Sequence, residues 1–239
     1  MNVRTGTGTS MDENQVLRWG GAAAMVGAGL ILVGNLLHPR ISDPGNVRDE
    51  LEAVADSGIW VFDHFLIAWA LGFLFVGLIA ITSYLDGGTS STMARIARAS
   101  VVGGVVVAFI AVSVDGMAMK TVADEWMASG ATDVTFATAN AVNQISLALF
   151  TALIGSFAGL SPVLITTAQL QSKRFAPWVC YLGMAGGLVC LAVSSIMVFA
   201  GPSGFVSNVL FTAGSLAVTV WVFMSGLHLW QRASEGAAT

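Results

Sequence analysis

Long apolar runs alternate with short polar segments along the whole chain. Five runs carry no charged residue and cover 19–37, 65–85, 99–114, 134–172 and 175–227. A helix needs about 20 residues to cross a bilayer, and the last run is long enough for two spans, with a break at Gly201-Pro202-Ser203-Gly204. Continuous rather than alternating apolar positions favour helices over a barrel. The pattern predicts an all-α integral membrane bundle of six transmembrane helices, at about 17–38, 59–85, 94–119, 136–162, 175–200 and 204–231.

Composition indicates one membrane-embedded unit. Hydrophobic residues make up 55% of the chain and charged residues 10%, and the mean hydropathy is +0.77. These values exclude an ordinary soluble domain. No repeat is visible, so we expect residues 1–239 to form a single transmembrane domain with the lipid bilayer as its main partner. The first span is followed by Pro39 rather than a small-residue cleavage site, which favours a retained helix over a signal peptide.

Basic residues concentrate on one side of this topology. Six spans put both termini on the same side, which receives Arg4, Arg18, Arg95, Arg98, Lys173, Arg174 and Arg232. The other side has only Arg40, Arg48 and Lys120, and its loops are acidic. The positive-inside rule therefore predicts cytoplasmic N and C termini in the cytoplasmic (inner) membrane of a bacterium or archaeon. We interpret the acidic loops first as solvated surface and second as a collector of cations.

The outer loops and one proline modify this plan. Residues 46–55 can form a short amphipathic helix with Val47, Leu51 and Val54 on one face, which would lie over the outer mouth as a cap. We expect residues 120–133 to form a second polar outer segment. Pro162 is predicted to kink or end the fourth helix, because proline removes a backbone hydrogen bond.

Aromatic and small residues suggest how the helices are placed. Trp60 and Trp126 are expected at the outer membrane boundary, and Trp69 and Trp221 in mid-span packing positions. Gly183 and Gly187 form a GxxxG pair, which predicts close packing within the chain and leaves open a homo-oligomer through the same residues. Cys180 and Cys190 are ten residues apart on one helix and are too far apart to form a disulfide.

The candidate site is a polar layer at the outer ends of the first four spans. An ionisable side chain inside a span is costly and usually faces the bundle interior or a wet cavity. We therefore expect Asp63 and Asp115 to face inward, with His38, His64, Lys120 and the amides of the fourth span as candidate partners. As an acid–base pair, His64 with Asp115 across helices fits better than the adjacent Asp63 and His64. The candidate ligand-binding residues are Asn35, His38, Trp60, Asp63, His64, Asp115, Met119, Asn140, Asn143 and Gln144.

Three functions fit such a layer. In the first, an outward-facing pocket binds a cation, a proton or a small polar ligand, as in a carrier or a sensor; His38 and His64 then act as neutral ligands or proton carriers. In the second, the layer only holds helices together in a structural or accessory membrane protein. In the third, His38, His64 and Asp115 ligate a metal or haem for redox chemistry.

Other classes find less support in the sequence. No Walker loop, zinc spacing, G-x-S-x-G motif or basic nucleic-acid patch is present. Ser113, Ser146 and Thr151 are better explained as backbone or interhelix hydrogen-bonding groups than as nucleophiles. We therefore favour a non-enzymatic role and expect no nucleic-acid partner, and the sequence identifies no cofactor.

Overall fold

The computed structural model describes residues 9–39 and 45–236, and the described part is all-helical. Six helices are long and apolar enough to cross a membrane, which is the architecture of a multi-pass membrane protein and confirms the predicted class. Arg4 and Arg40 lie outside the described residues. The elements are α1 (Thr9–Leu37), α2 (Val47–Asp56), α3 (Trp60–Tyr84), η1 (Gly88–Ser90), α4 (Ser91–Ser113), η2 (Val114–Met119), α5 (Lys120–Ala128), α6 (Asp133–Leu153), η3 (Ile154–Leu160), α7 (Ser161–Ser172), α8 (Pro177–Ala200), η4 (Phe205–Leu210) and α9 (Phe211–Gly236).

The third and fourth spans are longer than the sequence predicts. Helix runs without a break over 88–128 and over 133–172, with lengths of 41 and 40 residues. The expected polar segment 120–133 is therefore mostly helical, and only its last residues form a turn. Pro162 does not end its helix. The π-helical turn η3 ends two residues before Pro162, so the proline lies where the regular α-helical hydrogen-bond pattern is already altered.

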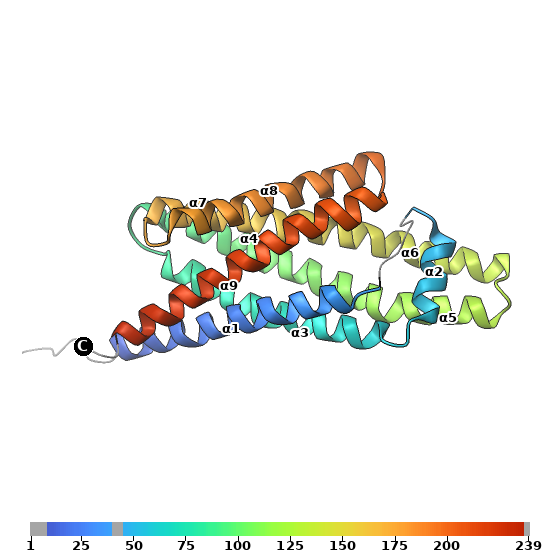
Figure 1. The fold of residues 1–239 in the computed structure, drawn as a ribbon, viewed down its shortest axis with the longest axis horizontal. Helices are drawn as coiled ribbons and strands as arrows, with labels where there is room; N and C mark the ends of the chain where they lie inside the picture. The colour runs from blue at the N-terminus through green and yellow to red at the C-terminus, as the bar shows by residue number, and fades with distance from the viewer. Residues whose placement is uncertain (1–8, 40–44, 237–239) are drawn as a thin grey trace, which may run out of the picture.

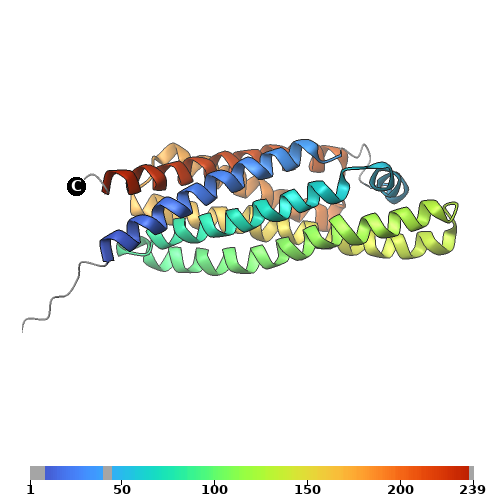
Figure 2. The same ribbon diagram turned by 90° about the horizontal axis from the view of Figure 1, so that it is seen from below.

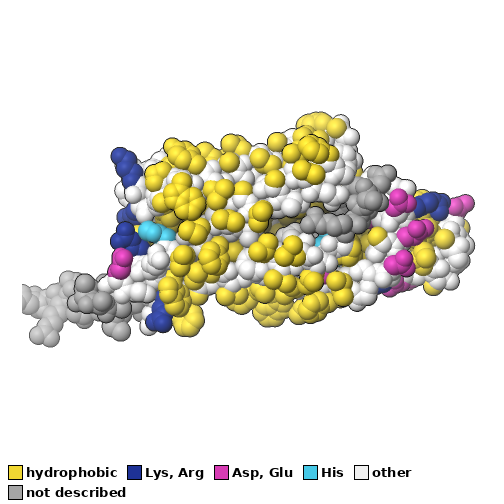
Figure 3. All heavy atoms as spheres, viewed as in Figure 1, with side chains coloured by type: hydrophobic (Ala, Val, Ile, Leu, Met, Phe, Trp, Pro, Cys, Tyr) yellow, Lys and Arg dark blue, Asp and Glu magenta, His cyan; other side chains and the backbone are white. Residues whose placement is uncertain are grey.

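The two ends of the bundle differ in charge. Figures 1 and 2 show the start of α1 and the end of α9 at one end, and the α5–α6 hairpin extending beyond the other helices at the opposite end. Lys and Arg side chains gather at the first end and Asp and Glu at the second (Figure 3). We refer to them as the basic end, which carries Arg18, Arg95 and Arg174, and the acidic end, which carries α2 and α5.

Helix α2 lies across the acidic end, as its amphipathic pattern predicts. Leu51 and Val54 are fully buried, in one cluster with Trp60, Met119 and Trp126. The N-cap Asn46 accepts a hydrogen bond from the Arg48 backbone N–H, and Lys120 donates to the carbonyl of Ala55 at the other end of α2. The buried cluster and the Lys120 hydrogen bond hold α2 against α5 and over the ends of α3, η2 and α6.

Close helix contacts depend on glycines within the chain. A Cβ built on Gly183 would lie 2.4 Å from the Trp221 side chain in α9, and one built on Gly187 would lie 2.9 Å from the carbonyl of Gly159 in η3. The predicted intramolecular packing of the GxxxG pair is therefore present. A homo-oligomer through Gly183 and Gly187 stays a prediction.

Gly77 gives a direct test of this packing. A Cβ there would lie 2.6 Å from Ala24 backbone atoms in α1, too close for any real contact, so Gly77→Ala must push α1 and α3 apart. We expect it to lower the free energy of unfolding by about 1 kcal/mol or more. Gly29→Ala is the control, because nothing lies within 4 Å of that position and alanine favours helix. Equal stability of the two variants in detergent denaturation would contradict the α1–α3 interface.

Three tryptophans differ from their expected roles. Trp60 and Trp126 are 1% exposed and form the core beneath α2, rather than an interfacial belt. Trp69 is exposed beside Phe65 and Phe73 on the outer face of α3, rather than packed inside. Hydropathy gives the depth of a residue along a span but not the direction in which its side chain points. Trp221 is fully buried, as expected.

Candidate functional site

Two histidine–aspartate pairs lie side by side near the acidic end. His38 Nδ1, at the end of α1, is 2.8 Å from Asp63 Oδ2 in α3. His64 Nε2, in α3, is 3.0 Å from Asp115 Oδ2 in η2. The two imidazole rings are 5.2 Å apart between centroids. Asp63 is fully buried, whereas the side chains of His38 and Asp115 are 33% and 24% exposed. The first pair thus joins α1 to α3, and the second joins α3 to η2.

The hydrogen-bond partners of His64 determine which of its ring nitrogens carry a proton. Its Nδ1 is 2.8 Å from the carbonyl oxygen of Trp60, which only accepts, so Nδ1 must carry a proton. Its Nε2 faces a carboxylate oxygen, so one further proton lies between His64 and Asp115. The pair is either imidazolium with carboxylate or imidazole with carboxylic acid. Both forms have zero net charge, and loss of the shared proton leaves one negative charge.

Neighbouring groups position both partners. The indole Nε1 of Trp60 donates to the carbonyl of Asp115 at 2.8 Å, and the hydroxyl of Ser146 in α6 donates to Asp115 Oδ1 at 3.1 Å. The Trp60 ring lies 5.0 Å from His38 and 4.7 Å from His64 between centroids. Gly116 allows η2 to approach, since a Cβ there would lie 2.5 Å from the Cβ of His64. Asp115 is therefore held by contacts from both α3 and α6.

Glu50 of α2 adds a third carboxylate that lines the site. Burial raises the pKa of the Glu50 carboxyl above its ordinary value, and the charge of Asp115 also raises it, while Asn143 and His38 oppose the shift. Asn143 itself is 2% exposed, and its Nδ2 makes no close hydrogen bond among the described residues. The acidic end of the site is thus rich in acceptors and poorly solvated.

The raised pKa of Glu50 predicts a pH-dependent stability. The folded protein holds the Glu50 proton more tightly than the unfolded chain, so this contribution to stability is full below the ordinary carboxyl pKa and is lost as pH rises through the folded-state pKa. Glu50→Gln removes the ionisable group, and with it the free-energy cost of ionising a poorly solvated carboxyl at high pH. We expect it to raise the Tm of the ligand-free protein at pH 8 and to change it little at pH 4. Glu52→Gln, at an exposed position of the same helix, should change neither value; a lower Tm for Glu50→Gln at pH 8 would contradict the assignment.

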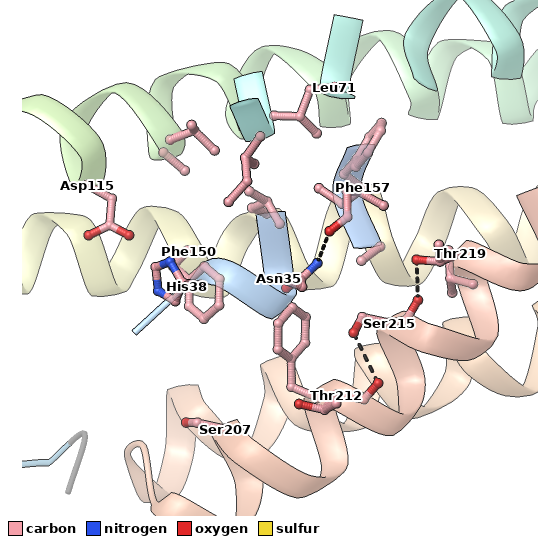
Figure 4. A pocket seen from close by; sticks show the side chains of 18 of the residues that line it. Asn35, His38, Leu71, Asp115, Phe150, Phe157, Ser207, Thr212, Ser215 and Thr219 are labelled. Carbon is pink, nitrogen blue, oxygen red and sulfur yellow. Dashed lines mark hydrogen bonds between the residues drawn. The ribbon is translucent and has the colours of Figure 1, made fainter. Parts of the chain in front are cut away.

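These groups line the polar end of a pocket of about 270 Å³. Figure 4 shows His38 and Asp115 pointing into it, together with Asn35 and Phe150. The ionisable side chains among its described lining residues are those of His38, Glu50, His64 and Asp115, and none of those lining residues is Lys or Arg. The remaining walls are mostly apolar. The pocket therefore brings the carboxyl groups of Glu50 and Asp115 together in surroundings of low polarity.

All three π-helical turns of the described chain contribute to the pocket. Asp115 comes from η2, Phe157 and Ala158 come from η3, and Ser207 comes from η4. A π turn widens a helix locally, and such turns occur frequently at functional sites. The extra residue in each π turn rotates the side chains that follow it about the helix axis, so they point in a different direction from that in a regular α-helix.

The predicted polar layer is only partly assembled. Asn35, His38, Trp60, His64 and Asp115 line the pocket. Asp63 lies behind His38, and Asn143 lies beside Glu50. The other predicted members lie elsewhere: Met119 is buried against α2, Gln144 is exposed, and Asn140 is not among the lining residues.

Two contributors were not predicted. Ser146 follows Asn143 by three residues and so shares its face of α6, and Glu50 lies three residues after Val47 and four before Val54 on the apolar side of α2. Helical spacing was the signal that could have identified both. The apolar walls carry no such signal, because lipid-facing and pocket-facing leucines look alike.

Among the described residues, one cluster could hold a metal ion. Ligand atoms of His38, Asp63 and His64 lie within 4.8 Å of one another. Both ring nitrogens of His64, however, already engage Trp60 and Asp115, and Nδ1 is protonated. Ligation by His64 would require one of these hydrogen bonds to break, so the geometry favours an ionic and proton-sharing role over a metal centre.

Comparison with known proteins assigns no role to these residues, because no family model matches the chain and no curated protein or solved structure is significantly similar to it.

Proposed function

We propose that this protein binds a small organic cation at the polar end of its pocket, as a carrier or sensor of such molecules. The observation that supports this best is the convergence of Glu50, Asp115 and the two histidine pairs on one pocket with no described Lys or Arg in its lining. A carboxyl group that gives up its proton in surroundings of low dielectric attracts a cation strongly.

Proton release at the His64–Asp115 pair is expected to accompany binding. The pair is neutral while it holds its shared proton, and a cation gains most when that proton leaves. The charged groups around it are Glu50 from α2, His38 from α1 and Asp63 from α3, with the neutral Ser146 from α6. Binding should therefore tighten as pH rises. Such exchange of a cation for a proton is the elementary step of a proton-coupled carrier.

We assign the basic end to the cytoplasm on the positive-inside rule, which puts the site near the outer surface of a cytoplasmic membrane. Arg18, Arg95, Arg98, Arg174 and Arg232 all belong to helix ends or turns at that basic end. In this orientation α2 and the acidic loops face the external medium. A cation arriving from outside meets negative charge first.

Matched neutral and charged probes test the proposal. Affinities of n-butylammonium, 1-butanol and butyrate are measured by tryptophan fluorescence on protein in lipid nanodiscs, with empty nanodiscs to correct for partition. We expect butylammonium to bind at least tenfold more tightly than 1-butanol, with no measurable butyrate binding, and its affinity to increase from pH 5.5 to pH 7.5. Equal binding of the amine and the alcohol would refute a cation site.

A further inference from the structure

The pocket continues beyond the polar cluster as a long apolar arm. Leu71, Leu74 and Leu78 of α3 line it on one side, and Trp221 and Val222 of α9 on another. Trp60 at the polar end and Leu78 at the far end lie on the same helix, about 27 Å apart at roughly 1.5 Å per residue. The lining therefore extends along α3 far enough to accommodate an extended alkyl chain.

The side of the pocket opens between α1 and α9. These helices are in close contact toward the basic end, where a Cβ on Gly21 would lie 2.6 Å from the carbonyl of Gly226. Toward the acidic end they diverge, and the space-filling view from the same side shows a hollow between them (Figures 1 and 3). Ile31 and Asn35 of α1 and Ser215 of α9 line the pocket here. The flanking surface is apolar.

The apolar residues beside the opening indicate that it faces lipid. Leu32 and Leu36 on α1 and Leu216 and Val220 on α9 are exposed large hydrophobic residues. Side chains of this kind face lipid in a membrane-spanning helix. At the aqueous end, by contrast, α2 covers the site and Glu50 closes its wall. Among the described residues, the opening into the arm is therefore lateral, toward the bilayer.

We infer that the ligand is a single-chain membrane amphiphile with a cationic head, a long-chain alkylammonium in its simplest form, which enters between α1 and α9. Its head lies at Asp115 and Glu50, and its tail fills the arm toward Trp221. The pocket has its polar end near the membrane surface and its apolar arm toward the midplane. A lipid in the leaflet at the acidic end has its head and tail oriented in the same way. The inference rests on the proposed function and adds the tail and the route.

A blocking substitution separates the tail from the head. Ser215 lines the arm on α9 and its hydroxyl only caps the carbonyl of Thr212 within the same helix, so Ser215→Phe should fill the arm without touching the polar end (Figure 4). Ala213→Phe is the matched control, because Ala213 is exposed on the same helix and does not line the pocket. Binding of n-dodecylammonium and n-butylammonium is measured in nanodiscs for both variants.

The expected result is selective. Ser215→Phe should weaken dodecylammonium binding at least tenfold and change butylammonium binding less than twofold, and Ala213→Phe should change neither. Unchanged dodecylammonium binding in Ser215→Phe would overturn the tail site while the cation site stands. Failure of wild-type protein to bind butylammonium would instead overturn the proposed function, and this inference with it.

A photoprobe on the wild-type protein gives a second readout that does not depend on a variant folding. Dodecylammonium carrying a diazirine at the end of its tail is cross-linked and the labelled peptides are identified by mass spectrometry. Labels on Leu74, Trp221 or Val222 would place the tail in the arm. Labels confined to lipid-facing positions such as Leu216 would refute the inference.

Discussion

Asp115→Asn should lower the affinity for n-butylammonium by roughly ten- to a hundredfold. The variant loses one charge-assisted contact of about 1.5–3 kcal/mol, and about 1.4 kcal/mol corresponds to a factor of ten. The fold should survive because every hydrogen bond at this position can be kept. The introduced amide group can donate to Nε2 of a neutral His64, and its oxygen can accept from Ser146. Affinity and pH dependence are measured together, and the part of the pH dependence that comes from the shared proton of the His64–Asp115 pair should disappear.

The matched control is Asp124→Asn. Asp124 is a carboxylate at the same end that pairs with Lys120 and does not line the pocket, so its neutralisation tests long-range charge alone. We expect less than a twofold effect. If Asp115→Asn instead keeps cation binding and loses stability, the His64–Asp115 pair is a packing device, and the structural alternative replaces the binding function. If it changes neither property, both interpretations are wrong.

His38→Ala should destabilise the protein by roughly 2–3 kcal/mol. Asp63 is fully buried, His38 is the partner of its Oδ2, and its Oδ1 has no hydrogen-bond partner among the described residues. Removal of the imidazole leaves a buried carboxylate without its partner. The free energy lost in this way is larger than the net stabilisation that the intact pair contributes. The partial exposure of His38 makes the loss smaller, because water can reach this side of the pair. The free energy of unfolding in mixed detergent micelles measures it.

A double-mutant cycle isolates the pair. Asp63→Asn keeps an acceptor for His38 and removes the buried charge, so we expect His38→Ala to cost far less in the Asp63→Asn background than in the wild type. Equal costs in both backgrounds would show that the two side chains are not coupled. Asn35→Ala, one turn away on the same helix, checks for a general effect at the end of α1.

The membrane architecture could be predicted from the sequence because each span must satisfy a length and a polarity set by the bilayer. The break at Gly201-Pro202-Ser203-Gly204 and the amphipathic helix with Leu51 and Val54 are both present. The predicted helix bounds were wrong where a helix continues past the apolar run. Residues 120–128 are too polar to count as part of a span, yet they are helical and pack beneath α2.

From the sequence, only the depth of the site along the spans could be predicted. Asp63, His64 and Asp115 were expected to turn inward because ionisable groups avoid lipid, and His64 does meet Asp115. The direction of uncharged or amphipathic groups was not constrained in this way. Gln144 therefore faces outward although Asn143 is buried, and the π turn η2 changes the phase of the helix at Asp115. The apolar arm depends on how six helices diverge, which no local pattern encodes.

The position of a bound cation tests the central claim most directly. In a crystal structure of the protein with 4-bromobenzylammonium, the anomalous signal of bromine locates the ring and the density locates the ammonium group. We expect the ammonium within hydrogen-bond distance of Asp115 or Glu50, with the ring directed toward Phe150 and the arm. A probe bound outside this pocket, or bound in it with the bromine at Asp115 and the ammonium in the apolar arm, would refute the cation site.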